Sequence, residues 1–323
     1  MQDIFGRTID YLRVSITDRC NLRCVYCMPC DFAPIPHEEI LRYEEILRLC
    51  GIMTSLGIRN IRVTGGEPLT RKGCVDFIEN LKSLPNVENV TLTTNAVLLE
   101  QHIETLVRIK IGGLNISLDS LKPETFQKLT GRDELAIVLK ALYTAIEAGI
   151  SVKINCVPIA GVNDNEIGAF AEMAERFPVF VRFIELMPTA VNAEARHFSS
   201  EKIFAVLKEK YPDLLQDEAK RGFGPARYFK SEKLVGGIAL IDAVSNHFCE
   251  SCNRLRLTSE GFLKLCLYHD ECLNLKSMLR GGASEREIEA AIKQVVLKKP
   301  ERHAFDSDTA RTSGIKKMSR IGG

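Results

Sequence analysis

Short segments rich in β-branched residues alternate with helix-like stretches along the first two thirds of the chain. The strand-like segments are residues 11–17, 58–64, 89–95, 113–119, 151–157 and 179–186. The clearest helical stretch runs from Asp133 to Ala148, with Thr130 or Asp133 as its expected N-cap and Gly149 at its end. Such alternation predicts a parallel sheet with crossover helices.

Six strand-helix units, rather than eight, predict an α/β fold in the form of an incomplete (βα)6 TIM-like barrel. After Ser199 the pattern changes to one helix, four short strands at 226–230, 236–241, 254–258 and 262–266, and an amphipathic helix at 284–299. We therefore expect a barrel domain at 1–198. Residues 199–323 should form a smaller C-terminal α+β layer that covers the open side of the barrel.

Composition places the chain among globular proteins and limits its partners. It has 323 residues, 45% of them hydrophobic, and a net charge of +1. A charge near zero gives no general attraction to nucleic acid or to anionic membranes. No apolar run reaches the roughly 18 residues of a membrane span, and the N-terminus lacks the apolar core of a signal peptide. We therefore expect a cytoplasmic protein with no nucleic-acid or membrane partner.

The eleven cysteines favour metal binding over disulfides, because the cytoplasm is reducing and six of them form two triplets. Cys20, Cys24 and Cys27 follow the first strand-like segment. Thiolates suit iron-sulfur clusters, and a four-iron cluster normally takes four of them. Three ligands would leave one iron open to a small molecule. The alternative is a structural zinc with Cys30 as its fourth ligand.

Cations interrupt four otherwise apolar strand segments. They are Arg13, Arg62, Lys153 and Arg182. A strand covered on both faces cannot bury a charge without a partner, and matching carboxylates are missing from these segments. The pattern predicts an anionic ligand, and guanidinium and ammonium groups suit phosphate. The alternatives are solvated charges at strand ends and, for Arg182, a local pair with Glu185.

The second triplet, Cys249, Cys252 and Cys266, spans a predicted hairpin. Ser259-Glu260-Gly261 reads as a three-residue turn with glycine at positive φ. This register pairs Arg256 with Lys264 and Arg254 with Cys266. Alternation then places Cys252, Arg254, Arg256 and Cys266 on one face of the hairpin.

The identity of the metal at the second triplet stays open on spacing alone. Cys266-x2-His269 supplies a possible fourth ligand, so a Cys3His zinc site is conceivable, and Cys272 is another candidate ligand. Without a fourth protein ligand, a 4Fe-4S cluster with an open iron is equally consistent with the spacing.

The first triplet is spaced Cys-x3-Cys-x-aromatic-Cys through Tyr26, and Gly65-Gly66-Glu67-Pro68 follows the second strand segment. This combination resembles the radical S-adenosylmethionine (SAM) superfamily. The segments TTN, NISLD, KIN, RFIELMP and FCESCNRLRLTSEGFLKLCL, with a terminal Gly-Gly, narrow the resemblance to its GTP-cyclising members, which begin molybdenum cofactor biosynthesis. The match runs from Arg13 to Gly323. One departure is Ala96, where these proteins more often have glycine.

The resemblance implies a role for each motif. The implied ligands of a first 4Fe-4S cluster are Cys20, Cys24 and Cys27, and those of a second are Cys249, Cys252 and Cys266. The implied contacts of SAM are Tyr26, Gly66, Ser117 and Met187, where the glycines would let the backbone approach the methionine amino group. The implied ligands of GTP are Arg13, Arg62, Thr93, Lys153, Arg254 and Arg256. A catalytic contribution is implied for Arg254 and Arg256, and for Gly322 and Gly323 of a tail that enters the active-site pocket.

The implied reaction is that of a lyase. A 5′-deoxyadenosyl radical from SAM abstracts hydrogen from ribose C3′ of GTP, and the carbon radical attacks C8 of the guanine, which lies at the open iron of the second cluster. The product is (8S)-3′,8-cyclo-7,8-dihydroguanosine 5′-triphosphate. The implied partners are a reductant such as flavodoxin or ferredoxin and, for hand-off of the product, cyclic pyranopterin monophosphate synthase. We expect a monomer or homodimer.

Two other functions are compatible with parts of this pattern. One is a radical SAM enzyme that modifies peptides with the help of an auxiliary cluster, although such enzymes commonly have more cysteines after the barrel. The other is a zinc-stabilised nucleic-acid binding or scaffold protein, against which the near-zero charge and the absence of tryptophan count.

Overall fold

A computed structural model describes residues 1–28, 32–188, 196–219, 221–246, 248–269 and 271–303. The chain forms two compact units. The first comprises Met1–Asn21, Cys27–Leu92 and Cys249–Gly323, and the second comprises Leu22–Tyr26 and Thr93–Phe248. Cys30, Gly322 and Gly323 lie outside the described residues.

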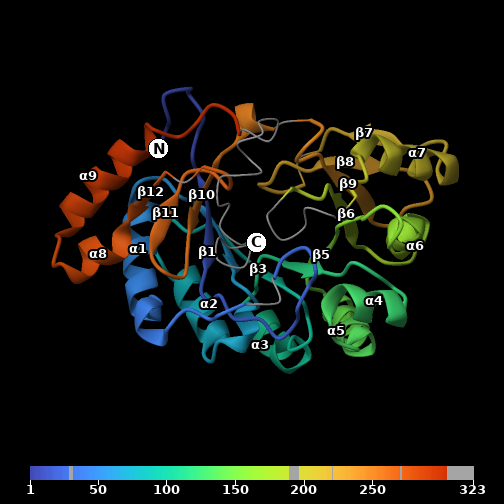
Figure 1. Ribbon diagram of the computed structural model, residues 1–323, viewed down its shortest axis with the longest axis horizontal. Helices are drawn as coiled ribbons and strands as arrows, with labels where there is room; N and C mark the ends of the chain where they lie inside the picture. The colour runs from blue at the N-terminus through green and yellow to red at the C-terminus, as the bar shows by residue number, and fades with distance from the viewer. Residues whose placement is uncertain (29–31, 189–195, 220, 247, 270, 304–323) are drawn as a thin grey trace. The chain divides into compact units, whose positions relative to one another are not determined.

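The first unit contains strands in the order β12-β11-β10-β1-β2-β3 (Figure 1). Their bounds are Tyr11–Ser15 (β1), Asn60–Thr64 (β2), Asn89–Thr94 (β3), Arg254–Leu257 (β10), Phe262–Lys264 (β11) and Cys272–Asn274 (β12). Strands β10, β1, β2 and β3 run parallel, whereas β11 and β12 pair antiparallel. The predicted strands at 11–17, 58–64 and 89–95 are thus confirmed with trimmed ends. Strand β10, expected in a separate C-terminal layer, instead extends the parallel sheet beside β1.

Helices of the first unit bury one apolar face each. They are α1 (Tyr43–Ser55), α2 (Cys74–Lys82), α8 (Leu275–Arg280) and α9 (Glu285–Val296), with 3-10 turns η1 (His37–Glu39), η2 (Pro68–Thr70) and η5 (Cys249–Ser251). The predicted helix at 284–299 is confirmed as α9. It begins at a capping box between Ser284 and Glu287, and Ile288 and Ile292 are fully buried on its inner face.

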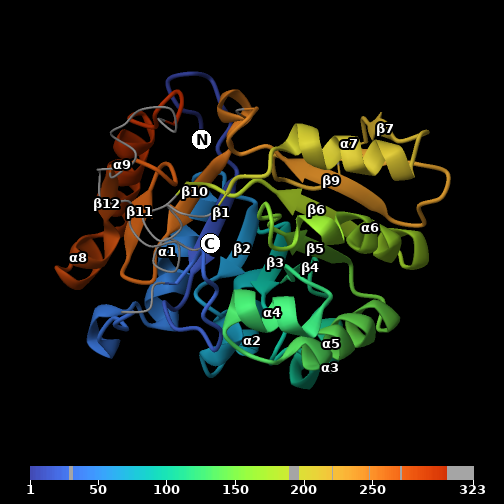
Figure 2. The same ribbon diagram turned by 45° about the vertical axis from the view of Figure 1, so that its right-hand side comes forward.

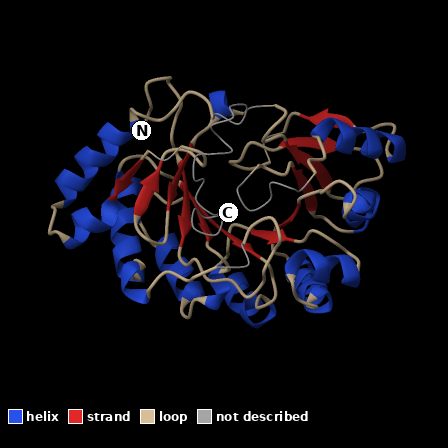
Figure 3. Cartoon of the chain, viewed as in Figure 1, coloured by secondary structure: helices blue, strands red, loops and turns tan. Residues whose placement is uncertain are grey.

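The second unit contains strands in the order β4-β5-β6-β9-β8-β7. Their bounds are Leu114–Ser117 (β4), Val152–Cys156 (β5), Phe180–Ile184 (β6), Leu215–Asp217 (β7), Arg227–Lys230 (β8) and Gly237–Ile241 (β9). Strands β4, β5, β6 and β9 are parallel, and β8 and β7 pair antiparallel. Figure 3 distinguishes these strands from the helices that accompany them.

The helices of the second unit are α3 (Ile103–Arg108), α4 (Pro123–Thr130), α5 (Leu135–Glu147), α6 (Ile167–Arg176) and α7 (Ser200–Lys210), with 3-10 turns η3 (Glu100–His102) and η4 (Asp164–Glu166) (Figure 2). The helix expected at 133–148 is confirmed as α5, followed by Gly149 at φ 76°. Its expected N-cap is wrong. Glu134 occupies the N-cap position, and its side chain makes no capping hydrogen bond. Thr130 is not the cap, because it lies in α4, where its hydroxyl donates to the carbonyl of Phe126 at 2.8 Å.

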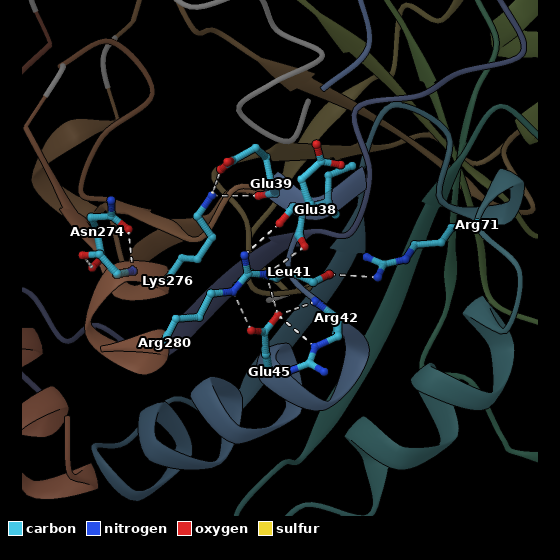
Figure 4. Close-up of polar contacts among 11 residues, drawn as sticks. Glu38, Glu39, Leu41, Arg42, Glu45, Arg71, Asn274, Lys276 and Arg280 are labelled. Atoms are coloured by element: carbon cyan, nitrogen blue, oxygen red, sulfur yellow. Dashed lines mark hydrogen bonds and ion pairs between the residues drawn. The ribbon is translucent and has the colours of Figure 1, made fainter. Parts of the chain in front are cut away.

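An ion pair between a partly exposed arginine and a buried carboxylate joins α8 to α1 (Figure 4). The Glu45 carboxylate, 7% exposed, accepts hydrogen bonds from Arg280 Nε at 2.8 Å and Nη2 at 3.1 Å, and from its helix-capping neighbour Arg42 N at 2.7 Å. Arg280 Nη1 also donates to the carbonyl of Glu38 at 2.8 Å, and Lys276 Nζ donates to the carbonyl of Glu39 at 3.0 Å. These contacts fasten the segment that carries β11, β12 and α8 to the helix that follows β1.

Replacing Arg280 with Met should lower the free energy of unfolding at neutral pH by about 1–3 kcal/mol, because a charge-assisted hydrogen bond to a buried carboxylate is lost. The Arg280 hydrogen bond lowers the pKa of Glu45 to about 2. The stabilisation is therefore complete above the unfolded-state pKa of about 4.5 and disappears as pH falls toward 2. The free energies of unfolding of the variant and the unchanged chain should therefore converge toward pH 2. Urea unfolding of both proteins from pH 7 to 2 measures this.

Arg42→Met is the matched control. Its guanidinium is 73% exposed and lies 3.7 Å from the same carboxylate, so its loss should change stability by no more than about 0.5 kcal/mol. Equal losses in the two variants, or a difference that is independent of pH, would contradict the prediction.

Candidate functional site

Three arginines and a threonine form one row across the sheet of the first unit. The parallel register sets Arg13 of β1 opposite Arg256 of β10 on one side and Arg62 of β2 on the other. Arg62 is in turn opposite Thr91 of β3. Because residues in register in a parallel sheet point to the same face, the three guanidinium groups share one face. Figure 2 shows β10, β1 and β2 as neighbours.

Polar atoms of this row are buried without partners. Among the described residues, the Nε atoms of Arg13 and Arg62 and the Thr91 hydroxyl have no hydrogen-bond partner. Burial lowers the pKa of Arg13 well below its usual value, and Arg256 and Arg62 lower it further. Burial and Arg254 also lower the pKa of Arg256, to about 10. Adjacent like charges with unmet donors suit a polyanion, since such a ligand would supply both charge and acceptors.

Sequence reasoning missed Thr91. Thr91 lies two positions before Thr93 on β3, so the two side chains point to the same face. Alternation along this strand would have identified Thr91 from the sequence. Thr93, predicted as a GTP ligand, belongs to the second unit, is partly buried, and its hydroxyl has no hydrogen-bond partner among the described residues.

Two predicted cations lie on strands of the second unit and have different surroundings. Lys153 of β5 donates from Nζ to the carbonyl of Arg221 at 2.5 Å and contacts the Tyr228 hydroxyl at 3.3 Å. Arg182 of β6, 4% exposed, donates from Nε to Asn155 Oδ1 at 2.8 Å and from Nη2 to Asn115 Oδ1. Neutral amide oxygens of β5 and β4 therefore accept hydrogen bonds from Arg182.

The alternative pair between Arg182 and Glu185 is wrong. The Glu185 carboxylate is fully buried and accepts hydrogen bonds from the backbone of Ser200, Val244 and Ser245, each at 2.8 Å. Burial acts to raise the pKa of Glu185, but hydrogen bonds led by that of the Ser245 hydroxyl hold it below its usual value. The carboxylate is thus used to fix the loops that follow β6 and β9.

The hairpin of the second cysteine triplet has the predicted register. Arg256 pairs with Lys264, and Gly261 has a φ of 86° in the turn. Cys249 lies in η5, Cys252 just before β10, and Cys266 two residues after β11. The pairing of Arg254 with Cys266 continues this register but stays a prediction.

Electrostatic interactions connect the three thiols of the second triplet. Burial raises the pKa of Cys249, and Cys266 and Cys252 raise it further. At Cys252 burial also acts upward, but Arg254 and Lys299 outweigh it and bring the pKa to about 7. A thiol that is readily deprotonated is a competent metal ligand, so this donor set fits an iron-sulfur cluster.

The expected fourth ligands of a zinc site are otherwise engaged or untested. His269 Nε2 lies 3.1 Å from the carbonyl of Arg302, and Cys272 is paired in β12 opposite Lys264. Within the described parts of the chain, His, Cys, Asp and Glu side chains do not gather in groups of three that could hold a metal ion. The ligand sets of both triplets therefore stay predictions.

The three cysteines of the first triplet are partly buried and are not joined in disulfides. Cys20 and Cys27 belong to the first unit and Cys24 to the second. The segment around Cys24 is anchored within its unit, because Arg23 N and Val25 N donate to the carbonyls of Thr130 and Leu129 at 2.8 and 3.0 Å.

Tyr26, the aromatic residue of the motif, is also anchored within the second unit. Its hydroxyl donates to Asp119 Oδ2 at 2.6 Å, and the Val157 amide donates to Asp119 Oδ1 at 2.8 Å. Burial raises the pKa of Asp119 to about 6. Asp119 was not among the predicted site residues, although it ends the NISLD segment two positions after Ser117.

Position 66 must be glycine, because the backbone of residues 17–19 packs too closely against it to leave room for a side chain. Its amide donates to the carbonyl of Thr17 at 2.7 Å, and a Cβ at this position would lie 2.1 Å from the carbonyl oxygen of Arg19. The GGEP turn is thus pressed against the segment that leads into Cys20. The predicted approach to the methionine amino group stays a prediction, as do the SAM contacts of Ser117, at the end of β4, and of Met187, after β6.

Ala96 follows β3 with a φ of 65°, in the left-handed region that favours glycine. It is fully buried, and its amide donates to the Thr94 hydroxyl at 3.0 Å. The departure noted at this position therefore places a side chain where the backbone is strained.

Comparison with known families divides the chain into two matched regions. Residues 14–174 match the radical SAM superfamily, and residues 179–305 match the family described as Molybdenum Cofactor Synthesis C. Across the described residues, none of the helices is both long and apolar enough to cross a membrane.

Curated relatives match along the whole length. The chain is 42% identical over 328 residues to the GTP 3′,8-cyclase of Heliobacterium modesticaldum, covering 100% of both chains. It is 40% identical over 306 residues to that of Clostridium perfringens, covering 94% of this chain and 95% of the other.

Among solved structures, SuiB of Streptococcus suis bound to S-adenosylmethionine is similar with a TM-score of 0.67. The sequences are 13% identical, and the match covers 98% of this chain and 76% of SuiB. At this identity the likeness concerns the fold alone. It confirms the predicted class, mixed α/β with the parallel sheet of a radical SAM partial barrel and antiparallel C-terminal strands.

The two family matches follow the order of the two cysteine triplets. The radical SAM match contains the first triplet, and the Molybdenum Cofactor Synthesis C match contains the second. The full-length relatives retain both regions at about 40% identity. The chain belongs to the GTP 3′,8-cyclase family of the radical SAM superfamily.

Proposed function

We propose that this protein converts GTP to (8S)-3′,8-cyclo-7,8-dihydroguanosine 5′-triphosphate, the first step of molybdenum cofactor biosynthesis. The observation that carries the proposal beyond family membership is the row of Arg256, Arg13 and Arg62. In this row Arg13 and Arg62 each offer a polyphosphate a buried Nε donor that has no partner among the described residues. The family supplies the nature of the nucleotide, since the full-length relatives are GTP 3′,8-cyclases.

In this proposal the arginine row binds the triphosphate. Arg13 and Arg62 donate from Nε, which has no competing acceptor among the described residues, and the Thr91 hydroxyl adds a neutral donor on the same face. Binding would offset the burial and the mutual repulsion that together lower the pKa of Arg13. Arg254, Thr93 and Lys153 are further predicted GTP ligands.

As a radical SAM protein, the chain uses a 4Fe-4S cluster and SAM. When bound, this pair supplies a 5′-deoxyadenosyl radical by reductive cleavage of SAM. We propose Cys20, Cys24 and Cys27 as the ligands of the cluster. The proposed SAM contacts are Tyr26, Gly66, Ser117 and Met187, of which Tyr26 is held by Asp119 and Gly66 by the backbone of 17–19.

We further propose a second 4Fe-4S cluster at Cys249, Cys252 and Cys266, with guanine at its open iron. Arg254 and Arg256 alternate on β10 directly after Cys252, so they would connect the base end of the site to its phosphate end. The lowered pKa of Cys252 supports ligation near neutral pH.

Some remaining parts of the proposal come from the family resemblance. They are a catalytic role for Gly322 and Gly323, a flavodoxin or ferredoxin as reductant, and hand-off to cyclic pyranopterin monophosphate synthase. The sequence pattern adds a cytoplasmic location and a division into 1–198 and 199–323, and we expect a monomeric or homodimeric state.

Anaerobically reconstituted protein, supplied with GTP, SAM and dithionite, should form 5′-deoxyadenosine and a cyclised nucleotide whose amounts rise together. Chromatography with mass spectrometry measures both. A preparation with about eight irons per chain that forms neither product would sink the proposal, and a colourless protein that contains zinc would favour the zinc-stabilised binding protein instead.

Replacing Arg13 with Met should raise the dissociation constant of GTP about 10- to 100-fold, since a charge-assisted hydrogen bond contributes about 1.5–3 kcal/mol. Equilibrium dialysis of the reconstituted protein measures it. Arg48→Met is the control, because that guanidinium is 46% exposed and pairs with Glu285 at 3.3 Å on the surface. An unchanged constant in the Arg13 variant would rule out the arginine row as the phosphate site.

Replacing His269 with Ala should leave the iron content unchanged, because its Nε2 is engaged with the backbone carbonyl of Arg302. Metal analysis and visible absorption after anaerobic reconstitution check this. Cys266→Ala is the positive control and should lose about half of the iron. Loss of metal from the second site in the His269 variant would establish a Cys3His zinc site in place of the cluster.

A further inference from the structure

The segment that follows α9 is fastened to the second cysteine triplet. Lys299 Nζ donates to the carbonyl of Arg254 at 3.0 Å and to that of Leu265 at 2.5 Å. Arg254 lies two residues after Cys252, and Leu265 directly precedes Cys266. One ammonium group therefore bridges the two strands of the hairpin next to both ligand positions.

Arg7 fastens the third cysteine to the same segment. Its Nη1 donates to the carbonyl of Cys249 at 2.8 Å, and its two terminal nitrogens donate to the carbonyls of Pro300 at 2.8 Å and Glu301 at 3.1 Å. Its Nε pairs with Asp3 at 2.5 Å. All three predicted ligand positions are thus tied to residues 299–301, which precede the C-terminal tail.

Lys299 differs from Arg7 in how its charge is balanced. Its side chain is buried, with 2% of the residue exposed, and burying an unpaired ammonium is costly. Within the described structure, burial and Arg7 lower the pKa of Lys299, whereas Cys252 and Cys266 raise it. Arg7 has the carboxylate of Asp3, whereas the groups that favour the charged form of Lys299 are the side chains of Cys252 and Cys266.

We propose that Lys299 is a positioning residue that holds the two hairpin strands at the spacing the second cluster needs and that balances the charge of its thiolate ligands. The inference rests on the proposed second cluster. A neighbouring positive charge favours the reduced, more negative form of a cluster, so Lys299 should raise the reduction potential.

The test uses the full chain with Cys20, Cys24 and Cys27 replaced by Ala, so that iron reports on the second site alone. Lys299→Met keeps the length of the side chain and removes its charge, and Lys299→Arg restores a cation. Lys298→Met is the matched control, because this neighbouring lysine is 65% exposed and lies 3.6 Å from Glu271. Iron content and a redox titration followed by absorption and electron paramagnetic resonance are measured after anaerobic reconstitution.

Lys299→Met should lower the ratio of reduced to oxidised cluster about tenfold at a fixed solution potential, a shift of about 59 mV for one electron. Lys299→Arg should recover most of the shift, and Lys298→Met should show none. Failure of Lys299→Met to hold iron, with recovery in Lys299→Arg, would also support the proposal.

A cluster of unchanged potential in Lys299→Met, or loss of iron from the Met and Arg variants alike, would overturn the role of the charge. If the chain that lacks only Cys20, Cys24 and Cys27 bound no iron, the proposal of a second cluster would itself be wrong. The two failures are therefore distinguishable.

Discussion

The parallel pairing of β1 with β10 is the constraint on which the first unit depends. It brings Arg13 and Arg256, separated by 243 positions in the sequence, into register next to Arg62. Three like charges on adjacent strands repel each other, and the shift in the pKa of Arg13 reflects that repulsion together with burial. Such an arrangement costs stability in the absence of a counter-charge, which the proposed triphosphate would supply.

The segments that carry the two cysteine triplets have a different requirement. They lie outside regular strands and helices, apart from the short turn η5 at Cys249, so other parts of the fold must hold them. Hydrogen bonds to Asp119, Thr130 and Leu129 hold the segment 23–26 in its unit, and those of Arg7 and Lys299 hold the second triplet. In both cases the proposed cysteine ligands lie on loops, and polar groups elsewhere in the fold fix those loops.

Buried charges in this protein thus have two uses that look alike in sequence. Arg182 and Glu185 are satisfied by amide and backbone partners and act as part of the scaffold. Arg13 and Arg62 retain buried donors with no partner among the described residues and suit a ligand. A strand segment with an internal arginine reads the same in both cases, and only the neighbouring strands distinguish them.

The sequence by itself determined the alternation of strands and helices, the hairpin register of Arg256 and Lys264, the two cysteine triplets and the family. Each of these depends on local periodicity, turn chemistry or residue spacing. Tertiary structure alone decided that β10 joins the parallel sheet beside β1, that Thr91 completes the arginine row, that asparagines satisfy Arg182, and that Arg7 and Lys299 secure the second triplet. Those contacts link residues up to 294 positions apart, and no local pattern encodes which distant backbone carbonyl or neighbouring strand a side chain will meet.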